Sequence, residues 1–220
     1  TGQLDLLIQN LFKLGQKLEV NWLRPRANTQ LLKLNYEYPI IAGTPLGTQV
    51  DFFLQREDTF FLTRKYRITF NYHMGVAGTL GFFVDDQVSS RLSAATVSIP
   101  IAENNIAIQN SDLSGYQLTQ YGVSYKLDDT DDLFFPKKGL KAYSEVGIGN
   151  KNIRSLPTGI TVSESQTIQW NTLHKWSYFL PTGKKSTWLN GIQAAWIWNE
   201  NLFVNDLYRL GGIKTMRGFN

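Results

Sequence analysis

The residues best suited to chemistry in this sequence are two histidines, a short acidic run and an arginine close to the last residue. His73 and His174 lie far apart in the chain, and no serine sits in the Gly-x-Ser-x-Gly context of an activated nucleophile. A phospholipase site built from His, Ser and Asp would need these groups to meet in space. The spacing gives no support for such a site, so we expect both histidines to be strand residues that face a lumen or a membrane interface.

Metal binding has equally little support. The run Asp128 to Asp132 could bind a cation, but a solvated turn explains the same residues. The chain has no cysteine, which excludes thiol catalysis, disulfides and thiolate ligands, and its His, Asp and Glu residues form no cluster with metal-ligand spacing. We therefore expect no metal site.

Composition narrows the class of protein further. The net charge is +4, from 22 Lys and Arg against 18 Asp and Glu, and the basic residues are interspersed with acidic ones. Nucleic-acid binding needs a concentrated basic face, so we expect no nucleic-acid partner. No apolar run reaches the roughly 18 to 20 residues of a membrane-spanning helix, which excludes a helical membrane protein.

Alternation of apolar and polar residues is the main structural signal. From Lys65 to His73, apolar side chains occupy the even positions and charged or polar ones the odd positions. A helix would spread these charges around its surface, so the element is a strand. The pattern recurs about ten times, with strands of the 9 to 11 residues expected for a tilted membrane strand. The alternating segments are 3–9, 17–22, 32–38, 50–55, 65–73, 80–84, 121–126, 140–148, 168–178 and 188–198.

The apolar faces end in tyrosine and tryptophan, which favours a membrane barrel over a soluble sandwich. Amphipathic rings at strand ends suit the two membrane interfaces, where one side of the ring meets water. In a sandwich the apolar faces would pack against a second sheet. The sequence therefore predicts an all-β fold, an antiparallel transmembrane β-barrel, with a soluble β-sandwich binding module as the alternative. The aromatic residues concerned are Trp22, Tyr36, Tyr38, Tyr72, Trp176, Tyr178, Trp196 and Trp198.

The connections between the expected strands alternate between compact and extended. The compact ones, rich in Gly and Pro, are 12–16, 40–48, 75–78, 128–138 and 181–186. The opposite side includes 85–114 and 150–166, which are far longer than ordinary hairpin loops. In outer-membrane barrels the short turns face the periplasm and the long loops face outward. By this count the segment around Arg217 lies on the outer side.

The last residues form a pattern of their own. Gly211 and Gly212 allow a tight turn or a close approach of the backbone to another surface, and Arg217 is followed by Gly218 and Phe219. An arginine in this context can reach inward from a loop that has folded back. The segment resembles the (V)RGF motif of the outer-membrane assembly superfamily, which includes BamA, TamA and the two-partner secretion transporters. In that family the motif tips a long surface loop that folds back inside a transmembrane barrel.

A second stretch resembles the same superfamily. Asp132, Pro136 and Gly139 match its D-x-x-x-P-x-x-G hairpin. Proline fixes φ and cannot donate to a strand ladder, and glycine permits the turn, so both suit a hairpin between strands. The resemblance extends over essentially the whole chain, although Met216 stands where the family commonly has valine.

The resemblance carries several expectations. It implies one domain over residues 1–220, a fragment that holds the second to eleventh strands of a barrel of about sixteen strands, plus the loop of Arg217. It implies the outer membrane of a Gram-negative bacterium, contact with outer-membrane lipid, and insertion or translocation of client proteins. It also implies that the protein is not an enzyme and uses no cofactor. Periplasmic POTRA domains and accessory lipoproteins are the further partners it implies. A passive outer-membrane pore for small solutes is the alternative function, because it would have the same barrel physics.

The polar residues expected to face the lumen leave two interpretations open, a wet interior or a binding surface for a plug or a passing polypeptide. Arg217 differs from them, because a cation inside a barrel needs an acidic partner to offset its desolvation. In the family that partner lies on strands after the motif. The lumenal set is Glu19, Lys33, Glu37, Asp51, Arg67, Lys141 and Glu145.

Overall fold

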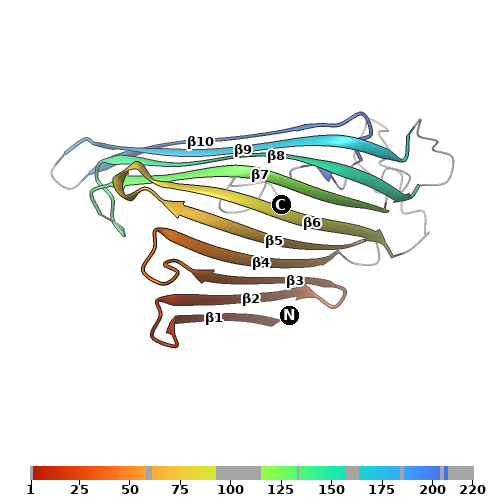
Figure 1. Ribbon diagram of the computed structural model, residues 1–220, viewed down its shortest axis with the longest axis horizontal. Coiled ribbons are helices and arrows are strands. Elements are labelled where there is room, and N and C mark those ends of the chain that lie inside the picture. The colour runs from red at the N-terminus through yellow and green to blue at the C-terminus, as the bar shows by residue number, and fades with distance from the viewer. Residues whose placement is uncertain are drawn as a thin grey trace.

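The computed structural model describes residues 2–57, 61–92, 115–132, 134–156, 164–183, 186–203 and 206–207. In these residues the chain forms ten strands and a short 3-10 helix, η1 (Gly75–Ala77). The strands form one antiparallel sheet in which spatial order follows sequence order (Figure 1). They are β1 (Gly2–Leu11), β2 (Gln16–Arg26), β3 (Thr29–Tyr38), β4 (Leu46–Glu57), β5 (Phe61–His73), β6 (Thr79–Arg91), β7 (Gly115–Thr130), β8 (Gly139–Ser155), β9 (Gln166–Pro181) and β10 (Thr187–Trp198).

This architecture confirms the predicted all-β antiparallel fold, and each alternating segment of the sequence forms a strand. The two packed sheets of a soluble sandwich are not found in the described residues, because every strand there pairs into the same sheet. Within those residues there is also no helix with the length and apolar character needed to cross a membrane.

Several strands are longer than predicted. β7, β8 and β9 contain 16, 17 and 16 residues. The predicted loops 85–114 and 150–166 therefore begin too early, since β6 continues to Arg91 and β8 to Ser155. Alternation fades there because both faces become polar, yet the ladder persists, with Thr119 paired to Asp86 on one side and to Asn150 on the other. Backbone pairing continues beyond the stretch in which side chains alternate.

The two faces of the sheet differ sharply in exposure. On the outer face, Phe70 is 59% exposed and Tyr121 is 54% exposed. On the inner face, Phe83 is 2% exposed and Gln120 is 4% exposed. An exposed apolar face and an inner face with buried polar groups reverse the arrangement of a soluble protein and suit a surface in contact with lipid. One row of directly paired outer residues runs Ile68, Val84, Tyr121, Ile148, Trp170, Trp198.

The connections lie at two opposite ends of the sheet (Figure 1). The turns after β1, β3, β5, β7 and β9 lie at one end, on the left in Figure 1, which we call the turn end. The connections after β2, β4, β6 and β8 lie at the other, which we call the loop end. Residues 199–203 follow β10 at the loop end.

Candidate functional site on the inner face

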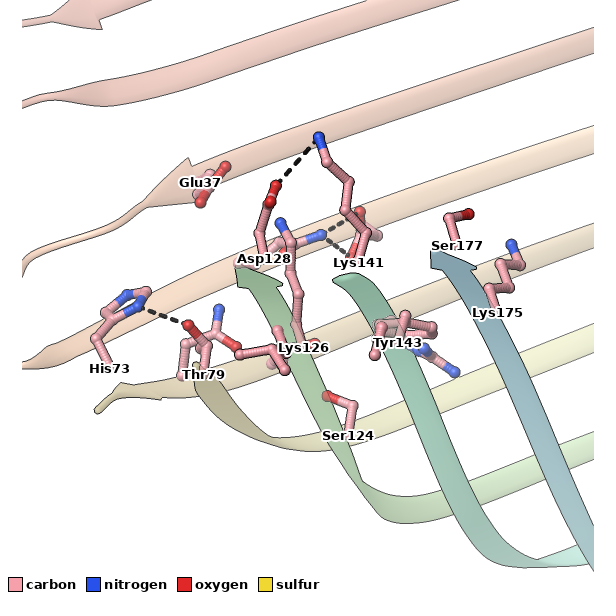
Figure 2. Close-up of a pocket in the computed structure, with 17 residues that line it drawn as sticks. Glu37, His73, Thr79, Ser124, Lys126, Asp128, Lys141, Tyr143, Lys175 and Ser177 are labelled. Atoms are coloured by element: carbon pink, nitrogen blue, oxygen red, sulfur yellow. Dashed lines mark hydrogen bonds and ion pairs between the residues drawn. The ribbon is translucent and has the colours of Figure 1, made fainter. Parts of the chain in front are cut away.

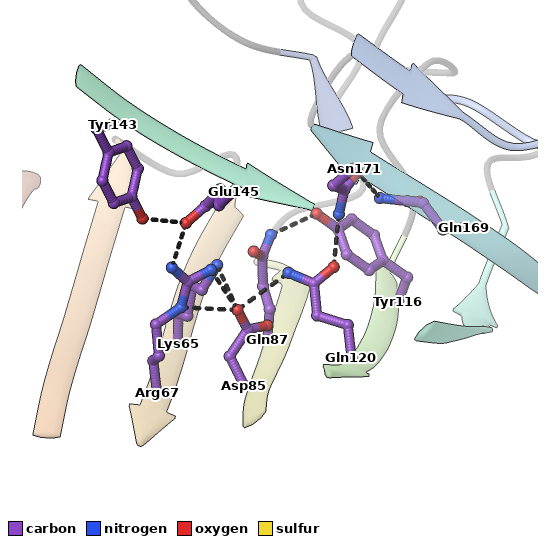
Figure 3. A network of polar contacts seen from close by, with 10 residues as sticks. All are labelled: Lys65, Arg67, Asp85, Gln87, Tyr116, Gln120, Tyr143, Glu145, Gln169 and Asn171. Carbon is purple, nitrogen blue, oxygen red and sulfur yellow. Dashed lines mark hydrogen bonds and ion pairs between the residues drawn. The ribbon is translucent and has the colours of Figure 1, made fainter. Parts of the chain in front are cut away.

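The inner face of β5 to β9 carries a network of charged and polar side chains, in which Arg67 has the most partners (Figure 3). Its Nε and Nη2 atoms donate to Oδ2 of Asp85 at 3.0 and 2.7 Å. Its Nη1 atom donates to Oε2 of Glu145 at 2.8 Å, although Glu145 lies on β8, three strands away. Such a contact requires the sheet to curve toward its inner face. The guanidinium therefore joins β5, β6 and β8.

Asp85 is the buried acceptor at the centre of this network. Its side chain is fully buried, and its Oδ2 atom also accepts from Lys65 at 3.0 Å and from Gln120 at 3.0 Å. A buried carboxylate needs this number of donors, because its water shell has been lost. Two cations and one amide contact Oδ2, whereas the buried Oδ1 has no hydrogen-bond partner among the described residues. Asp85 thus depends on side chains from β5 and β7.

The network continues toward β9 through amide side chains. Asn171 donates to Oε1 of Gln120 at 2.6 Å, and Gln169 donates to Oδ1 of Asn171 at 3.1 Å. On the other side, the Tyr143 hydroxyl donates to Oε2 of Glu145. Figure 3 shows these contacts as one chain of partners from Tyr143 to Gln169. Polar contacts therefore join five consecutive strands, which fixes their relative positions.

Two glycines make room for the aromatic ring beneath this network. The centroid of the Phe83 ring lies 4.1 Å from Cζ of Arg67, which is a cation–π contact. A Cβ atom built on Gly122 would lie 2.6 Å from Cζ of Phe83, and one on Gly147 would lie 3.2 Å from the same atom. Larger side chains at these positions would displace the ring. Glycine on β7 and β8 thus permits the stacking that positions Arg67.

A pocket of about 560 Å³ lies on the inner face toward the turn end (Figure 2). Lys141 and Asp128 form an ion pair across it at 3.2 Å, and His73 Nδ1 lies 3.0 Å from Oγ1 of Thr79. Figure 2 shows these side chains around a shared opening. The charged residues of both signs that line it are Glu37, Asp51, Arg67, Lys126, Asp128, Lys141 and Lys175. Four members of the predicted lumenal set, Glu37, Asp51, Arg67 and Lys141, line one pocket, as a wet interior requires.

A second polar cluster lies at the loop end, where Lys151 of β8 contacts the segment after β10. Its Nζ atom forms an ion pair with Asp206 Oδ2 and donates to the backbone oxygen of Asn201 at 2.8 Å. Both side chains of the pair are fully buried. The rings of Tyr116 and Phe203 flank the ammonium group, with centroids 4.7 and 4.9 Å from Nζ. We call this cluster the Lys151–Asp206 anchor.

The anchor holds the chain after β10 on the inner face. The Asp206 carboxylate also accepts from the Phe203 backbone N–H at 2.8 Å, so it orders the segment to which it belongs. Asn199 adds a contact with β9, donating from Nδ2 to Oγ1 of Thr167 at 2.9 Å. The segment that leads to residues 208–220 is thereby directed inward at its base.

The predicted hairpin residues lie in the connection between β7 and β8. Oδ1 of Asp132 accepts from the backbone N–H groups of Phe134 and Phe135, both at 2.8 Å. These two bonds hold the pKa of Asp132 below its usual value, because they favour the charged form. Gly139 has φ 114°, and a Cβ atom there would lie 2.0 Å from the Asp129 oxygen. Pro136 is half-buried in the same connection.

The other predicted positions have different outcomes. Gly211, Gly212, Arg217, Gly218 and Phe219 lie outside the described residues. His174 lies on the outer face of β9, with Nδ1 3.0 Å from Oγ of Ser144 and rings of Trp176 and Trp196 nearby. It is far from His73, which lies on the inner face, so the two do not form one site. The described part of the chain contains no group of three or more His, Cys, Asp or Glu residues able to hold a metal ion.

Sequence reasoning missed Asp85, Lys151 and Asp206. The first two fall in stretches predicted as loops, and both belong to the inner-facing register of strands that continue further than expected. Pairing arithmetic could have found them, because Asp85 follows Phe83 at a spacing of two and Lys151 follows Gly149 in the same way. Asp206 has no periodic signal, since it lies after the last strand.

Comparison with known proteins adds a family. A family model described as the Omp85 superfamily domain matches residues 10–220 of the chain. No curated protein matches the chain significantly. The matched range includes β2 to β10, the inner-face network and the Lys151–Asp206 anchor.

Proposed function

Because the chain belongs to the Omp85 superfamily, whose members are outer-membrane proteins that insert or transport other proteins, we propose that it is an insertase or translocase of the BamA and TamA type. The family match over residues 10–220 carries this proposal. The proposed activity involves no covalent chemistry and no cofactor. Its partners are outer-membrane lipid and client proteins, with POTRA domains and accessory lipoproteins as further proposed partners.

The physical basis of the proposed activity is an imperfectly closed barrel. An unpaired strand edge presents backbone N–H and C=O groups to an incoming β-hairpin, and in a membrane those groups have no other partners. The exposed apolar side chains of the outer face place the sheet in contact with lipid, where such an edge would act. The client strand would exchange its hydrogen bonds with water for bonds with the sheet.

Within this proposal Arg217 stabilises the active form by reaching the inner face of the barrel. The Lys151–Asp206 anchor supports it, because it directs the start of the segment inward. Eleven positions separate Asp206 from Arg217, since 217 minus 206 is 11. An extended chain of that length spans up to roughly 36 to 40 Å, which is enough to reach the inner-face network.

The proposal is tested with Arg217→Ala in the full-length protein. We expect slower insertion of a client barrel into liposomes and a lower thermal stability of the barrel, because the inward cation is lost. Lys214→Ala, which removes a cation from the same segment, is the matched control and should leave both unchanged. Wild-type values of both quantities in Arg217→Ala would contradict the role proposed for this residue.

A passive pore is the second candidate, and the mixed-charge pocket of about 560 Å³ is the observation that favours it, because such a surface stays wet. Planar-bilayer conductance and client insertion, measured on the same preparation, separate the two functions. Conductance without acceleration of client insertion would favour the pore and contradict the insertase.

A further inference from the structure

Exposed arginines occupy the outer face of the sheet at its loop end. Arg24, Arg56 and Arg64 lie in the same alternating register as the apolar outer residues of β2, β4 and β5. Arg64 lies two positions from Tyr66 and Arg24 two positions from Trp22, so each arginine is the next outward side chain beyond an aromatic ring. They mark the boundary at which the apolar band ends and polar surface begins.

Arg64 and Arg154 lie on the same outer face at the loop end, three strands apart. Arg64 pairs with Val88, Val88 with Gln117, and Gln117 with Asn152, so these four residues form one row from β5 to β8. Arg154 follows on β8, and its Nη2 atom donates to Oε1 of Gln117. Three strand spacings separate β5 from β8, so the backbones of the two arginines lie roughly 14 Å or more apart on the outer face.

No carboxylate in the described part of the chain forms a salt bridge with Arg64 or Arg154. The salt bridges found there lie on the inner face. The nearby carboxylate of Asp86 accepts instead from neutral groups, Nε2 of Gln117 and Oγ1 of Thr119, both at 2.7 Å. The surface around Arg64 and Arg154 therefore keeps a net positive charge next to lipid-facing side chains.

The opposite end of the outer face differs. There the outward positions of the described strands hold mainly aromatic and aliphatic residues, such as Tyr72, Tyr125 and Tyr178. The acidic Asp129 is also in this register, and no lysine or arginine of these strands is. A general preference for solvated charges at strand ends would place cations at both ends. The asymmetry indicates that the loop end meets a more anionic environment.

We propose that Arg64 and Arg154 bind the phosphate groups of an anionic lipid headgroup at the loop end, with Arg24 extending the same basic surface. One guanidinium group can donate two parallel hydrogen bonds to the oxygens of a phosphate, and it is more weakly hydrated than an ammonium group. Gln117 orients one of them, and the exposed side chains of Tyr66 and Ile168 lie below, where acyl chains would pack. The position directly beyond lipid-facing residues favours a lipid over a soluble phosphate compound.

The test uses the full-length protein in detergent and a bis-phosphorylated lipid A preparation as the probe, with retained lipid counted by native mass spectrometry. The double variant Arg64→Gln/Arg154→Gln should weaken retention by roughly fivefold for each arginine removed, because one basic side chain near an anionic lipid surface contributes about that factor. Dephosphorylated lipid A should bind the wild type and the variant equally. Lys175→Gln, which removes a cation from the inner face, is the matched control and should retain lipid as the wild type does.

Several results would overturn the proposal. These are equal retention by the double variant and the wild type, loss of retention in Lys175→Gln, or wild-type protein that retains dephosphorylated lipid A as well as it retains the bis-phosphorylated form. Full competition by inorganic phosphate would identify a free-anion site in place of a lipid site. Arg64→Lys/Arg154→Lys keeps both charges and should retain most of the lipid, which separates loss of binding from misfolding. The test does not depend on client insertion, so its outcome is independent of the proposed insertase activity.

Discussion

Lys151 and Asp206 form an ion pair in which neither side chain has any solvent exposure, and this pair joins β8 to the segment that follows β10. Removing one partner of a buried pair leaves the other charge without compensation. Among the ion pairs of the described residues, this pair is also the nearest in sequence to the residues that resemble the family's loop motif. Variants of this pair therefore test both the stability of the sheet and the attachment of the segment that leads to the motif.

Lys151→Ala should lower the free energy of unfolding by about 3 to 5 kcal/mol, because Asp206 would remain buried and unpaired. The measurement is urea unfolding in lipid vesicles, followed by tryptophan fluorescence. Lys141→Ala is the control, because its pair with Asp128 is about one-third exposed and should cost under about 1 kcal/mol. Equal losses in the two variants would contradict the burial of the anchor.

The double variant Lys151→Met/Asp206→Leu should recover most of the stability lost in Lys151→Ala, since apolar replacement of both partners leaves no buried charge. Limited proteolysis after Lys or Arg in residues 208–220 then tests whether the anchor, besides contributing to stability, also holds the segment after β10 in place. We expect faster cleavage in Lys151→Ala than in the double variant. The reverse order would show that packing at this position does not hold the segment.

Arg67→Leu should destabilise the barrel by about 3 kcal/mol, because Glu145 loses its cation and Asp85 keeps only Lys65 and Gln120. Arg67→Lys should fall between this variant and the wild type, since an ammonium group cannot reproduce the fork that contacts both carboxylates. Arg64→Leu, on the exposed outer face, should change the free energy of unfolding by under about 0.5 kcal/mol. Similar unfolding of Arg67→Leu and Arg64→Leu would refute the importance of the network.

Gly122→Ala should lower the free energy of unfolding by about 1 to 3 kcal/mol, because its Cβ would lie 2.2 Å from the Val146 oxygen and 2.6 Å from Phe83 Cζ. Gly191→Ala is the matched control on β10, where the nearest atom to the new Cβ is the Trp176 oxygen at 3.9 Å. Thermal unfolding of the two variants provides the comparison. A tolerated Gly122→Ala would show that Phe83 does not need the space that glycine leaves.

The hairpin between β7 and β8 should lose order in acid. Backbone N–H groups donate to the carboxylates of Asp131 and Asp132 and hold the pKa of each below its usual value. A pKa lowered by folding contributes stability that is present above the unfolded pKa and is lost as the pH falls through the folded pKa. We expect lower protection factors against amide exchange at Phe134, Phe135 and Lys137 below about pH 4, and Asp132→Asn to remove most of this pH dependence at Phe134 and Phe135. Protection factors that stay the same between neutral and acidic pH would contradict this prediction.

Period-two alternation was sufficient to predict the strands, their order and the outward direction of their apolar side chains. It succeeds from Lys65 to His73 because water or lipid meets each face consistently along that stretch. It fails at Asp86 and Asn152, where both faces are polar and only backbone pairing continues. Strand ends were therefore misplaced even though strand identities were right.

The inner-face contacts could be predicted only in part. The sequence indicates that Arg67 and Glu145 face inward, but their contact depends on the curvature of four strands, which no local pattern encodes. The burial of Lys151 depends on a segment 55 positions later in the chain. Alternation identifies which side chains share a face, and tertiary geometry decides which of them meet.

The network from Tyr143 to Gln169 also has a mechanical consequence. Any gap that opened between β5 and β8 would have to break the contact of Arg67 with Glu145, whereas the contacts of Asn21 with Asp5 and of Asn35 with Asp51 join adjacent strands. Strands β5 to β9 are thus cross-linked by side chains over several strands and form the stiffer part of the sheet. Strands β1 to β4 form the more compliant part. Under lateral membrane pressure, elastic deformation will concentrate in β1 to β4. Changes in the width of the barrel will therefore come from these strands.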